Sequence, residues 1–296
     1  MYKRRTDLAL EAQELYTQSQ RREPDGVRVT ELSRGPISVH RVAVLDERGE
    51  QALEKPRGNY VTLSFSPRML TDRDSFADCA RALADELSAL LPEKGEVLVV
   101  GLGNRAMTPD AIGPLAVREV VVTRHLRAQF PEAFGTMRST CAVLPGVLGM
   151  TGVETAELVR GTVAHVKPAA VIAIDALASR SASRLCSTFQ LADTGITPGG
   201  GVCNARDALN RETLGVPVIA IGVPTVVDAL TLAADMLEEA GIDAMLPERE
   251  LSVSSLFVTP RDIDAQVAKS ARIIGCAVNL ALHPDLTLAD MEQFLS

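Results

Sequence analysis

The chain has 296 residues, and a hydrophobic content of 46% is enough for a large core. Its 30 basic and 38 acidic residues give a net charge of −8, which argues against a general nucleic-acid binder, since such proteins present a basic face. No apolar stretch reaches the roughly 20 residues that cross a bilayer, and no apolar signal core follows the basic N-terminus. We therefore expect a cytoplasmic protein with no membrane contact and no direct nucleic-acid binding.

The first part of the chain is less regular than the rest. Residues 1–35 are polar and arginine-rich and are expected to form an N-terminal arm outside the core, with a short helix over about 8–18. Two alternating segments, 42–45 and 60–65, are expected to be strands that pair around a turn at 46–49.

From residue 72 onward the pattern becomes a repeated alternation of strands and helices. Four apolar runs are predicted to be strands, at 97–100, 141–144, 169–174 and 218–222. Apolar residues at helical spacing predict helices at 74–91, 111–128, 154–165, 226–240 and 262–282. Apolar strands that alternate with helices indicate an α/β fold with a mainly parallel or mixed sheet and helices on both faces. No strong domain boundary is visible.

Two of these strands are followed by carboxylates. The run Val97–Val100 leads into Gly101-Leu102-Gly103-Asn104 and then reaches Asp110, and the run Val171–Ile174 leads directly into Asp175. Ligands gather at the carboxyl ends of strands in an open α/β sheet, so both acidic groups are expected at one edge. Two carboxylates there could do acid–base chemistry or hold a metal ion.

Each candidate also has a structural interpretation. Asp110 precedes a predicted helix and could be only its cap. Asp175 has no such role, although Arg180 or Arg184 could pair with it. Asp228 is a third candidate, but its place in the first turn of a helix favours capping.

Other chemistries have weaker support. Gly101-x-Gly103-x-x-Ala106 superficially matches a dinucleotide-binding fingerprint, but Pro109 stands where the phosphate-binding helix should continue. Asp193-Thr194-Gly195 looks like the active-site triplet of pepsin-type proteases, yet those enzymes are all-β and need two triplets, so a turn is expected here. The four histidines are scattered and no G-x-S-x-G is present, which disfavours a serine or cysteine hydrolase. A metal site built from Asp110, Asp175 and one histidine stays open.

Several ordered segments together resemble one family, the germination proteases of endospore-forming bacteria. These segments are Arg5–Ala12, Gly101–Asn104, Thr108–Asp110, Pro145–Gly152, Ile174–Ala178, Gly222–Ala229 and Val258–Pro260. The resemblance spans nearly the whole chain. It implies an endopeptidase that degrades small acid-soluble spore proteins during germination, lies in the cytoplasm of the forespore or spore core, and forms a homo-oligomer.

The resemblance also implies a precursor that processes itself by cutting after an acidic residue. Asp7–Leu8 is then the bond that is cut, with residues 1–7 as a propeptide that blocks or misaligns the site and 8–296 as a single α/β endopeptidase domain. One departure from the family lies between Asp228 and Val258, where this chain has about 30 residues and many relatives carry a considerably longer insertion. Substrate access or oligomer contacts could therefore differ.

The family is similar in fold to the hydrogenase maturation endopeptidases. By that likeness Asp110 and Asp175 are the catalytic residues of an atypical aspartic protease, with Asn104 and Asp228 as possible support and no metal or cofactor. Peptide hydrolysis by two carboxylates needs one ionised to activate water and one protonated, an asymmetry that close like charges produce. The sequence leaves open which aspartate is the base.

Two alternatives remain. A metal-dependent maturation-type endopeptidase would use the same acidic positions, and a metal-bound water would be preferred if the two aspartates lie well apart. A non-catalytic α/β binding protein would leave its own chain and spore proteins uncut.

Overall fold

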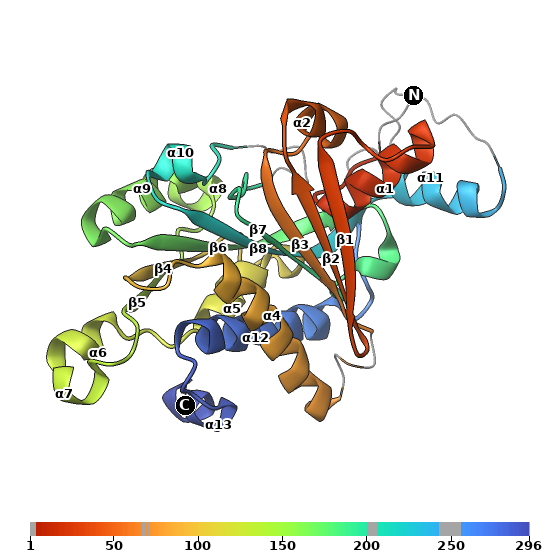
Figure 1. The fold of residues 1–296 in the computed structure, drawn as a ribbon. Helices are drawn as coiled ribbons and strands as arrows, with labels where there is room; N and C mark the ends of the chain where they lie inside the picture. Colours follow the sequence, from red (N-terminus) through yellow and green to blue (C-terminus); the bar gives the residue numbers. More distant parts are fainter. Residues whose placement is uncertain (1–3, 67–68, 70–71, 200–205, 243–255, 296) are drawn as a thin grey trace.

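The structure is a computed structural model that describes residues 4–66, 69, 72–199, 206–242 and 256–295. Within these residues, nine strands form one mixed sheet in the order β1-β2-β3-β7-β8-β6-β4-β5, with β9 paired to β8 (Figure 1). The strands are β1 (Val27–Arg34), β2 (Ile37–Val44), β3 (Gly58–Ser64), β4 (Val97–Gly101), β5 (Thr140–Val143), β6 (Ala170–Ser179), β7 (Thr188–Ala192), β8 (Val218–Asp228) and β9 (Phe257–Val258). The neighbours β5, β4, β6 and β8 are parallel, and the other pairs are antiparallel.

The parallel half of the sheet follows from strands that are apolar along their whole length. Every residue of β4 and β8 is buried, because helices cover both faces of these strands. All four strands predicted from the apolar runs are present, although β6 and β8 continue as far as Ser179 and Asp228. The α/β class, the mixed form of the sheet and helices on both faces are therefore confirmed.

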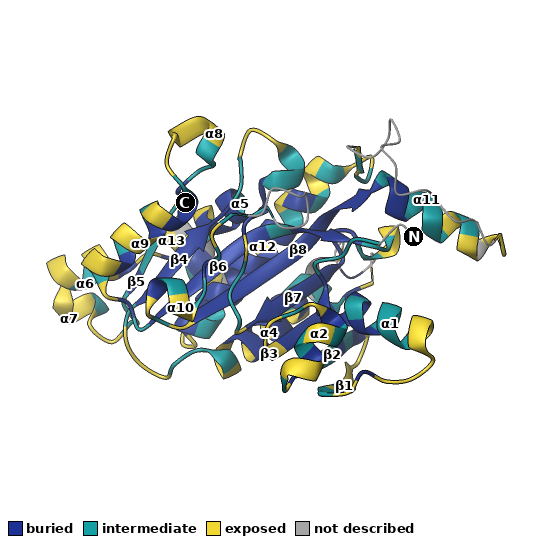
Figure 2. Cartoon of the chain, turned by 90° about the horizontal axis from the view of Figure 1, so that it is seen from above, coloured by how far each residue is buried: buried dark blue, intermediate teal, exposed yellow. Residues whose placement is uncertain are grey.

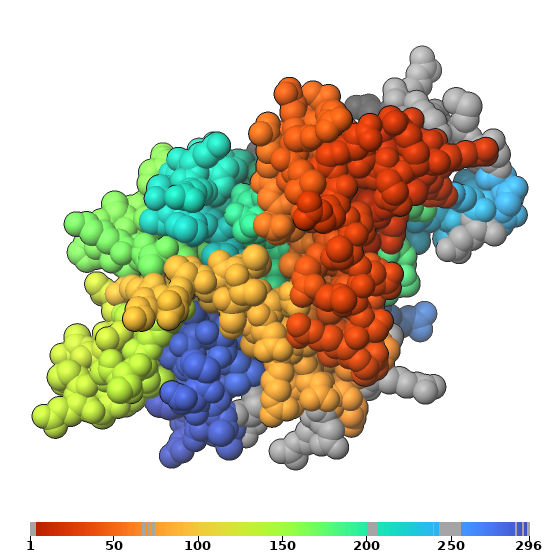
Figure 3. Space-filling model, in the orientation of Figure 1, coloured from red at the N-terminus to blue at the C-terminus, as the bar shows by residue number. Residues whose placement is uncertain are grey.

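Part of the N-terminal segment belongs to the core, so the expectation that residues 1–35 lie outside it is wrong for residues 8–11, which are buried. The helix α1 (Ala9–Gln20) lies against the sheet, and Leu8 and Ala9 are fully buried. Residues 27–34 form the edge strand β1, which has a polar sequence because most of its side chains are exposed. Figure 3 shows this N-terminal part (red) packed against the segment that follows it (orange).

The connection between β2 and β3 also differs from the expected turn. The two strands pair antiparallel as expected, but the helix α2 (Glu47–Leu53) lies between them in the sequence. Asp46 caps this helix, because its side chain accepts hydrogen bonds from the main-chain N–H groups of Arg48 and Gly49. The polar segment at 46–49 is therefore the start of a helix.

Helices cover both faces of the sheet (Figure 1). One face carries α4 (Arg73–Leu90), α5 (Ile112–Arg118) and α12 (Ile263–Leu282), and the other carries α1, α2, α9 (Thr155–Val166) and α10 (Arg211–Leu214). The remaining helices are α6 (Arg124–Gln129), α7 (Pro131–Phe134), α8 (Leu148–Thr151), α11 (Ala229–Glu239) and α13 (Leu288–Leu295), with short 3-10 turns η1 (Thr108–Asp110) and η2 (Ala182–Arg184). Figure 2 shows the buried strands between helices that are exposed on their outer sides.

The single helix predicted over 111–128 is wrong, because the chain forms α5 and α6 with a break between them. Asn279 of α12 stabilises this break: its Oδ1 accepts a hydrogen bond from Val121 N (2.8 Å) and its Nδ2 donates to Glu119 O (2.8 Å). A side chain distant in sequence thus satisfies main-chain groups that a continuous helix would satisfy itself.

Among the described residues, no helix is both long and apolar enough to cross a membrane. Residues 243–255, which make up much of the short segment between Asp228 and Val258, lie outside the described residues. The same is true of residues 1–3 of the expected propeptide.

Candidate active site

Asp175 lies inside a strand rather than at its end, which corrects the expectation from the sequence. The strand β6 continues to Ser179 because it stays paired with β8 over this length. The neighbouring strand β4 stops at Gly101, which pairs with Ile174. Asp175 is therefore the first residue of β6 beyond the end of β4. From here β6 stays paired with β8 but no longer with β4, and we call this point the step of the sheet.

Asp110 is brought to this step by a tight turn after β4. Leu102 N donates to Ile174 O (2.8 Å), and Asn104 N donates both to the Asp110 side chain (Oδ2, 2.8 Å) and to Asp110 O (3.0 Å). Thr225 of β8 donates from Oγ1 to the carbonyl of Pro109 (2.6 Å). The turn η1 is thus held by β6 and β8, and Asp110 lies above the end of β4.

The capping role considered for Asp110 is wrong. Ala111 stands at the N-cap of α5, and no side chain makes a capping hydrogen bond there. The Asp110 carboxylate binds the main chain of Asn104 instead. Asn104 therefore supports Asp110 through its backbone, while its own side chain accepts a hydrogen bond from Ala106 N (2.9 Å).

Burial raises the pKa values of both aspartates, and the charge of Asp110 adds to the increase at Asp175. Asp175 is only 4% exposed, and burial raises its pKa well above the usual 3.8, with the charge of Asp110 adding to the increase. Burial also raises the pKa of Asp110, but the hydrogen bond from Asn104 N opposes that increase. The two carboxyl groups are therefore close enough to interact, and Asp175 is the more deeply buried of the two.

The arginines that the sequence offered as partners for Asp175 are engaged elsewhere. Arg180 Nε lies 2.9 Å from Asp235 Oδ1, and Arg184 Nη1 lies 3.0 Å from Glu11 Oε1. Asp175 Oδ1 instead accepts a hydrogen bond from Ala176 N (2.9 Å).

Asp228 is not brought to the aspartate pair. It is the last residue of β8, and its Oδ1 accepts a hydrogen bond from Thr231 N (2.9 Å), so the expected capping of α11 is confirmed. Gly222 pairs with Asp175, and the six residues from Gly222 to Asp228 span roughly 20 Å of strand. The other oxygen, Oδ2, lies 3.7 Å from Arg5 Nη1, so Asp228 contacts the N-terminal segment.

The triplet Asp193-Thr194-Gly195 forms the expected turn, because Asp193 and Thr194 lie in a turn after β7. The Asp193 carboxylate accepts hydrogen bonds from Asn59 N (2.7 Å) and Asn59 Nδ2 (2.7 Å). The triplet thus joins the start of β3 to the end of β7.

The Asp7–Leu8 bond lies on the sheet beside this step. Asp7 N donates to Ala178 O (2.9 Å), and Ala178 N donates to Asp7 Oδ2 (2.8 Å). Burial raises the pKa of Asp7, and the charge of Asp7 contributes to the raised pKa of Asp175. The carbonyl oxygen of Asp7 accepts hydrogen bonds from Lys55 Nζ (3.0 Å) and Gln190 Nε2 (3.3 Å).

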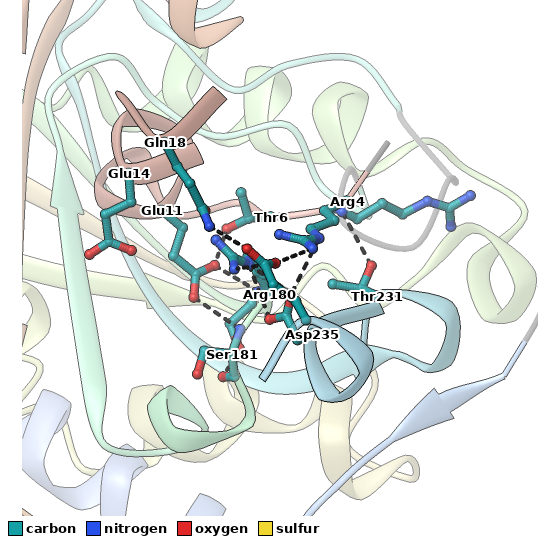
Figure 4. Close-up of polar contacts among 12 residues, drawn as sticks. Arg4, Thr6, Glu11, Glu14, Gln18, Arg180, Ser181, Thr231 and Asp235 are labelled. Atoms are coloured by element: carbon teal, nitrogen blue, oxygen red, sulfur yellow. Dashed lines mark hydrogen bonds and ion pairs between the residues drawn. The ribbon is translucent and has the colours of Figure 1, made fainter. Parts of the chain in front are cut away.

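Charged side chains hold the N-terminal segment on both sides of that bond (Figure 4). Upstream, Arg4 forms ion pairs with Asp235 (3.3 Å) and Glu238 of α11. Downstream, the fully buried Glu11 accepts hydrogen bonds from Arg180 N (2.7 Å) and Ser181 N (3.1 Å). Residues 4–11 are thus fixed by the loop after β6 and by α11.

The sequence did not identify Lys55, Gln190 or Glu11 as parts of this site. Lys55 stands in a polar loop without any motif, and Glu11 is one of several acidic residues of a polar helix. Gln190 carries a weak signal, since it is a polar residue in the buried segment Thr188–Ala192. Only the register of β7 against β8 places it near Asp175.

The three-ligand metal site considered from the sequence is not formed by the described residues. Among them, no group of three or more His, Cys, Asp and Glu side chains could hold a metal ion. The donor set at the step of the sheet is the pair Asp110 and Asp175, with Asp7 of the N-terminal segment nearby.

The sequence comparisons agree on one family. The family model described as Germination protease matches residues 6–241. A germination protease from Caldanaerobacter subterraneus subsp. tengcongensis is 46% identical, over 98% of each chain. Another, from Clostridium perfringens strain SM101, is 40% identical over the full length of both chains. Among solved structures, the NiFe hydrogenase maturation protease HycI from Thermococcus kodakarensis KOD1 is 19% identical with a TM-score of 0.36, covering 66% of this chain and 99% of that one.

Proposed function

The chain belongs to the germination protease family, and we propose that it is an aspartic endopeptidase whose substrates are small acid-soluble spore proteins. We propose further that it is made as a precursor that cuts its own Asp7–Leu8 bond. The observation that carries this proposal is the arrangement at one step of the sheet, where Asp175 follows the end of β4, the Asn104 turn holds Asp110, and Asp7 is hydrogen-bonded to Ala178 of the same strand as Asp175. Family membership supports action in the cytoplasm of the forespore and assembly into a homo-oligomer.

The different environments of the two aspartates suggest their roles. Asp110 ionises first and acts as the base that takes a proton from water, and Asp175 stays protonated because it is more deeply buried. The water oxygen adds to the carbonyl carbon of the residue before the cut bond, and the carbonyl electron pair moves to its oxygen. When this intermediate collapses, the C–N bond breaks and the leaving nitrogen takes the proton of Asp175. Asp110 then passes the proton that it took from water to Asp175, which restores both carboxyl groups, so the atoms of water end in the new carboxyl group and the new amine.

The contacts of residues 4–11 support control by a propeptide. Leu8 has no exposed surface, and Asp7 is hydrogen-bonded to β6 through its main chain and its side chain. A chain segment in this position occupies the space beside Asp175 that a substrate would need. Loss of residues 1–7 would therefore remove the segment that excludes other chains.

The proposal is tested by replacing each aspartate with asparagine in the full chain. Mass spectrometry of the purified wild type is expected to show loss of residues 1–7 and then cleavage of an added small acid-soluble spore protein. Asp110→Asn and Asp175→Asn should each slow self-cleavage by at least about 10³-fold, because neither can complete the acid–base pair. Asp285→Asn, at an exposed carboxylate, is the matched control and should process normally. Full processing by either active-site variant would refute the assignment.

A further inference from the structure

We infer that Lys55 and Gln190 bind the carbonyl oxygen of the peptide bond that is cut and stabilise the negative charge that this oxygen gains. This inference rests on the proposed function, because it takes Asp7–Leu8 as a bond that the site cuts. It adds two residues, from the antiparallel half of the sheet, to the aspartate pair.

Two donors from different elements converge on one main-chain oxygen. Lys55 lies between α2 and β3, and its Nζ is 3.0 Å from Asp7 O. Gln190 lies in β7, and its Nε2 is 3.3 Å from the same oxygen. The lysine also approaches the preceding carbonyl, that of Thr6, at 3.4 Å. A cation and an amide therefore meet at the carbonyl whose carbon the attacking water must reach.

The sheet places Gln190 in one transverse row with Asp175. Both residues pair with Gly222 of β8, from opposite sides. Their neighbours Ile174 and Leu191 pack in the core on the face of α4, α5 and α12, so the side chains of Asp175 and Gln190 point to the opposite face. That is the face on which α1 and the Asp7–Leu8 bond lie.

The orientation of the Gln190 amide is fixed by a second contact. Its Oε1 accepts a hydrogen bond from Ala9 N (2.7 Å), which leaves Nε2 directed to Asp7 O. The side chain is 7% exposed, so both ends of this amide bind the main chain in a nearly dry site. When the segment leaves, the same amide can bind the main chain of another protein in the same way.

These contacts become stronger during the reaction. Addition of water converts the neutral Asp7 carbonyl oxygen into an oxyanion, and a hydrogen bond from an ammonium group to an anion is stronger than one to a neutral oxygen. When the intermediate collapses, the electron pair returns to the carbon, the bond to Leu8 N breaks, and the oxygen is neutral again. Donors aimed at developing charge lower the barrier because they need no reorganisation.

The test measures the rate of self-cleavage in the full chain. Lys55→Met should slow it by about 10²-fold or more, the usual effect of removing one donor to an oxyanion. Lys55→Arg keeps a cationic donor and should recover most of the rate. Lys94→Met, at an exposed lysine before β4, is the control and should cleave as the wild type does.

Gln190→Glu provides an independent variant. A carboxylate can still accept the hydrogen bond from Ala9 N, but it cannot donate to Asp7 O and would repel the oxyanion. The new charge lies in a nearly dry site and should lower the melting temperature. Measured well below that temperature, we expect a slower reaction by about tenfold or more. For Lys55→Ala, added ethylammonium should restore part of the rate, which repair of a merely structural defect would not do.

The outcomes separate this inference from the proposed function. Wild-type rates in both Lys55→Met and Gln190→Glu would overturn the inference, while loss of cleavage in Asp110→Asn would still support the aspartate pair. A wild-type chain that never cuts itself would overturn both. Slow cleavage in the two donor variants, with recovery in Lys55→Arg, would establish the role of these residues.

Discussion

The main-chain oxygen of Asp110 lies 2.1 Å from the position that a Cβ atom on residue 103 would occupy. Gly103 also has a φ of +103°, a conformation that residues with side chains rarely adopt. The turn that carries Asp110 can therefore close onto the end of β4 only with glycine at this position.

Gly103→Ala should displace Asp110 and lower both activity and stability. We expect a loss of at least about 2 kcal/mol in the free energy of unfolding, from backbone strain and the clash together, with self-cleavage slowed more than 10-fold. Gly161→Ala is the control, since this helical glycine has open space where the Cβ would lie and should gain about 0.5–1 kcal/mol. Denaturant unfolding and mass spectrometry measure the two effects. A Gly103→Ala chain that processes at the normal rate would contradict this account of the turn.

Asp175 should make the folded chain less stable as the pH rises. Its pKa in the folded state is raised, chiefly by burial, so the folded state keeps a proton that the unfolded chain releases above about pH 4. The free energy of unfolding therefore decreases from that pH up to the folded-state pKa. Asp175→Asn cannot ionise and should be more stable than the wild type at pH 8, with a smaller difference at pH 4.

Urea unfolding of both chains at the two pH values checks this sign. Asp285→Asn, which removes an exposed carboxylate, should show no such pH-dependent difference. A stability gain of Asp175→Asn that is equal at pH 4 and pH 8 would show that burial does not shift Asp175 as inferred.

Asp193 should matter for stability but not for catalysis. Asp193→Ala removes two hydrogen bonds to Asn59, which should lower the free energy of unfolding by about 1–2 kcal/mol. Because the carboxylate binds the start of β3, self-cleavage should continue at the normal rate. Denaturant unfolding and the mass of the processed chain are the measurements. Blocked cleavage in a stable variant would instead assign a catalytic role to the triplet.

The parallel half of the fold could be predicted because its strands are continuous apolar runs, and their order along the chain brings Asp110 and Asp175 to one place. The end of β6 could not be predicted from the sequence. Asp175 interrupts the apolar run, but the pairing of β6 with β8 continues to Ser179. The break after α5 was also hidden, because it depends on Asn279, a side chain distant in sequence.

The antiparallel half carried less information in its sequence. The strand β1 lies at an edge and exposes most of its side chains, so it resembles a polar loop. Lys55 and Gln190 reach the Asp7 carbonyl only through the register of β3, β7 and β8, which no local pattern reveals. The aspartate pair was therefore predictable, and the groups that meet the bound chain were not.

The amide of Gln190 touches the main chain on both sides of one residue, Leu8, at Asp7 O and at Ala9 N. It therefore requires a main-chain carbonyl and a main-chain N–H at this spacing, whatever side chains the bound segment carries. A chain with proline at the position of Ala9 has no main-chain N–H there and cannot donate this hydrogen bond to Gln190. Among proteins bound in this manner, segments with proline at this position would bind less well than segments without it.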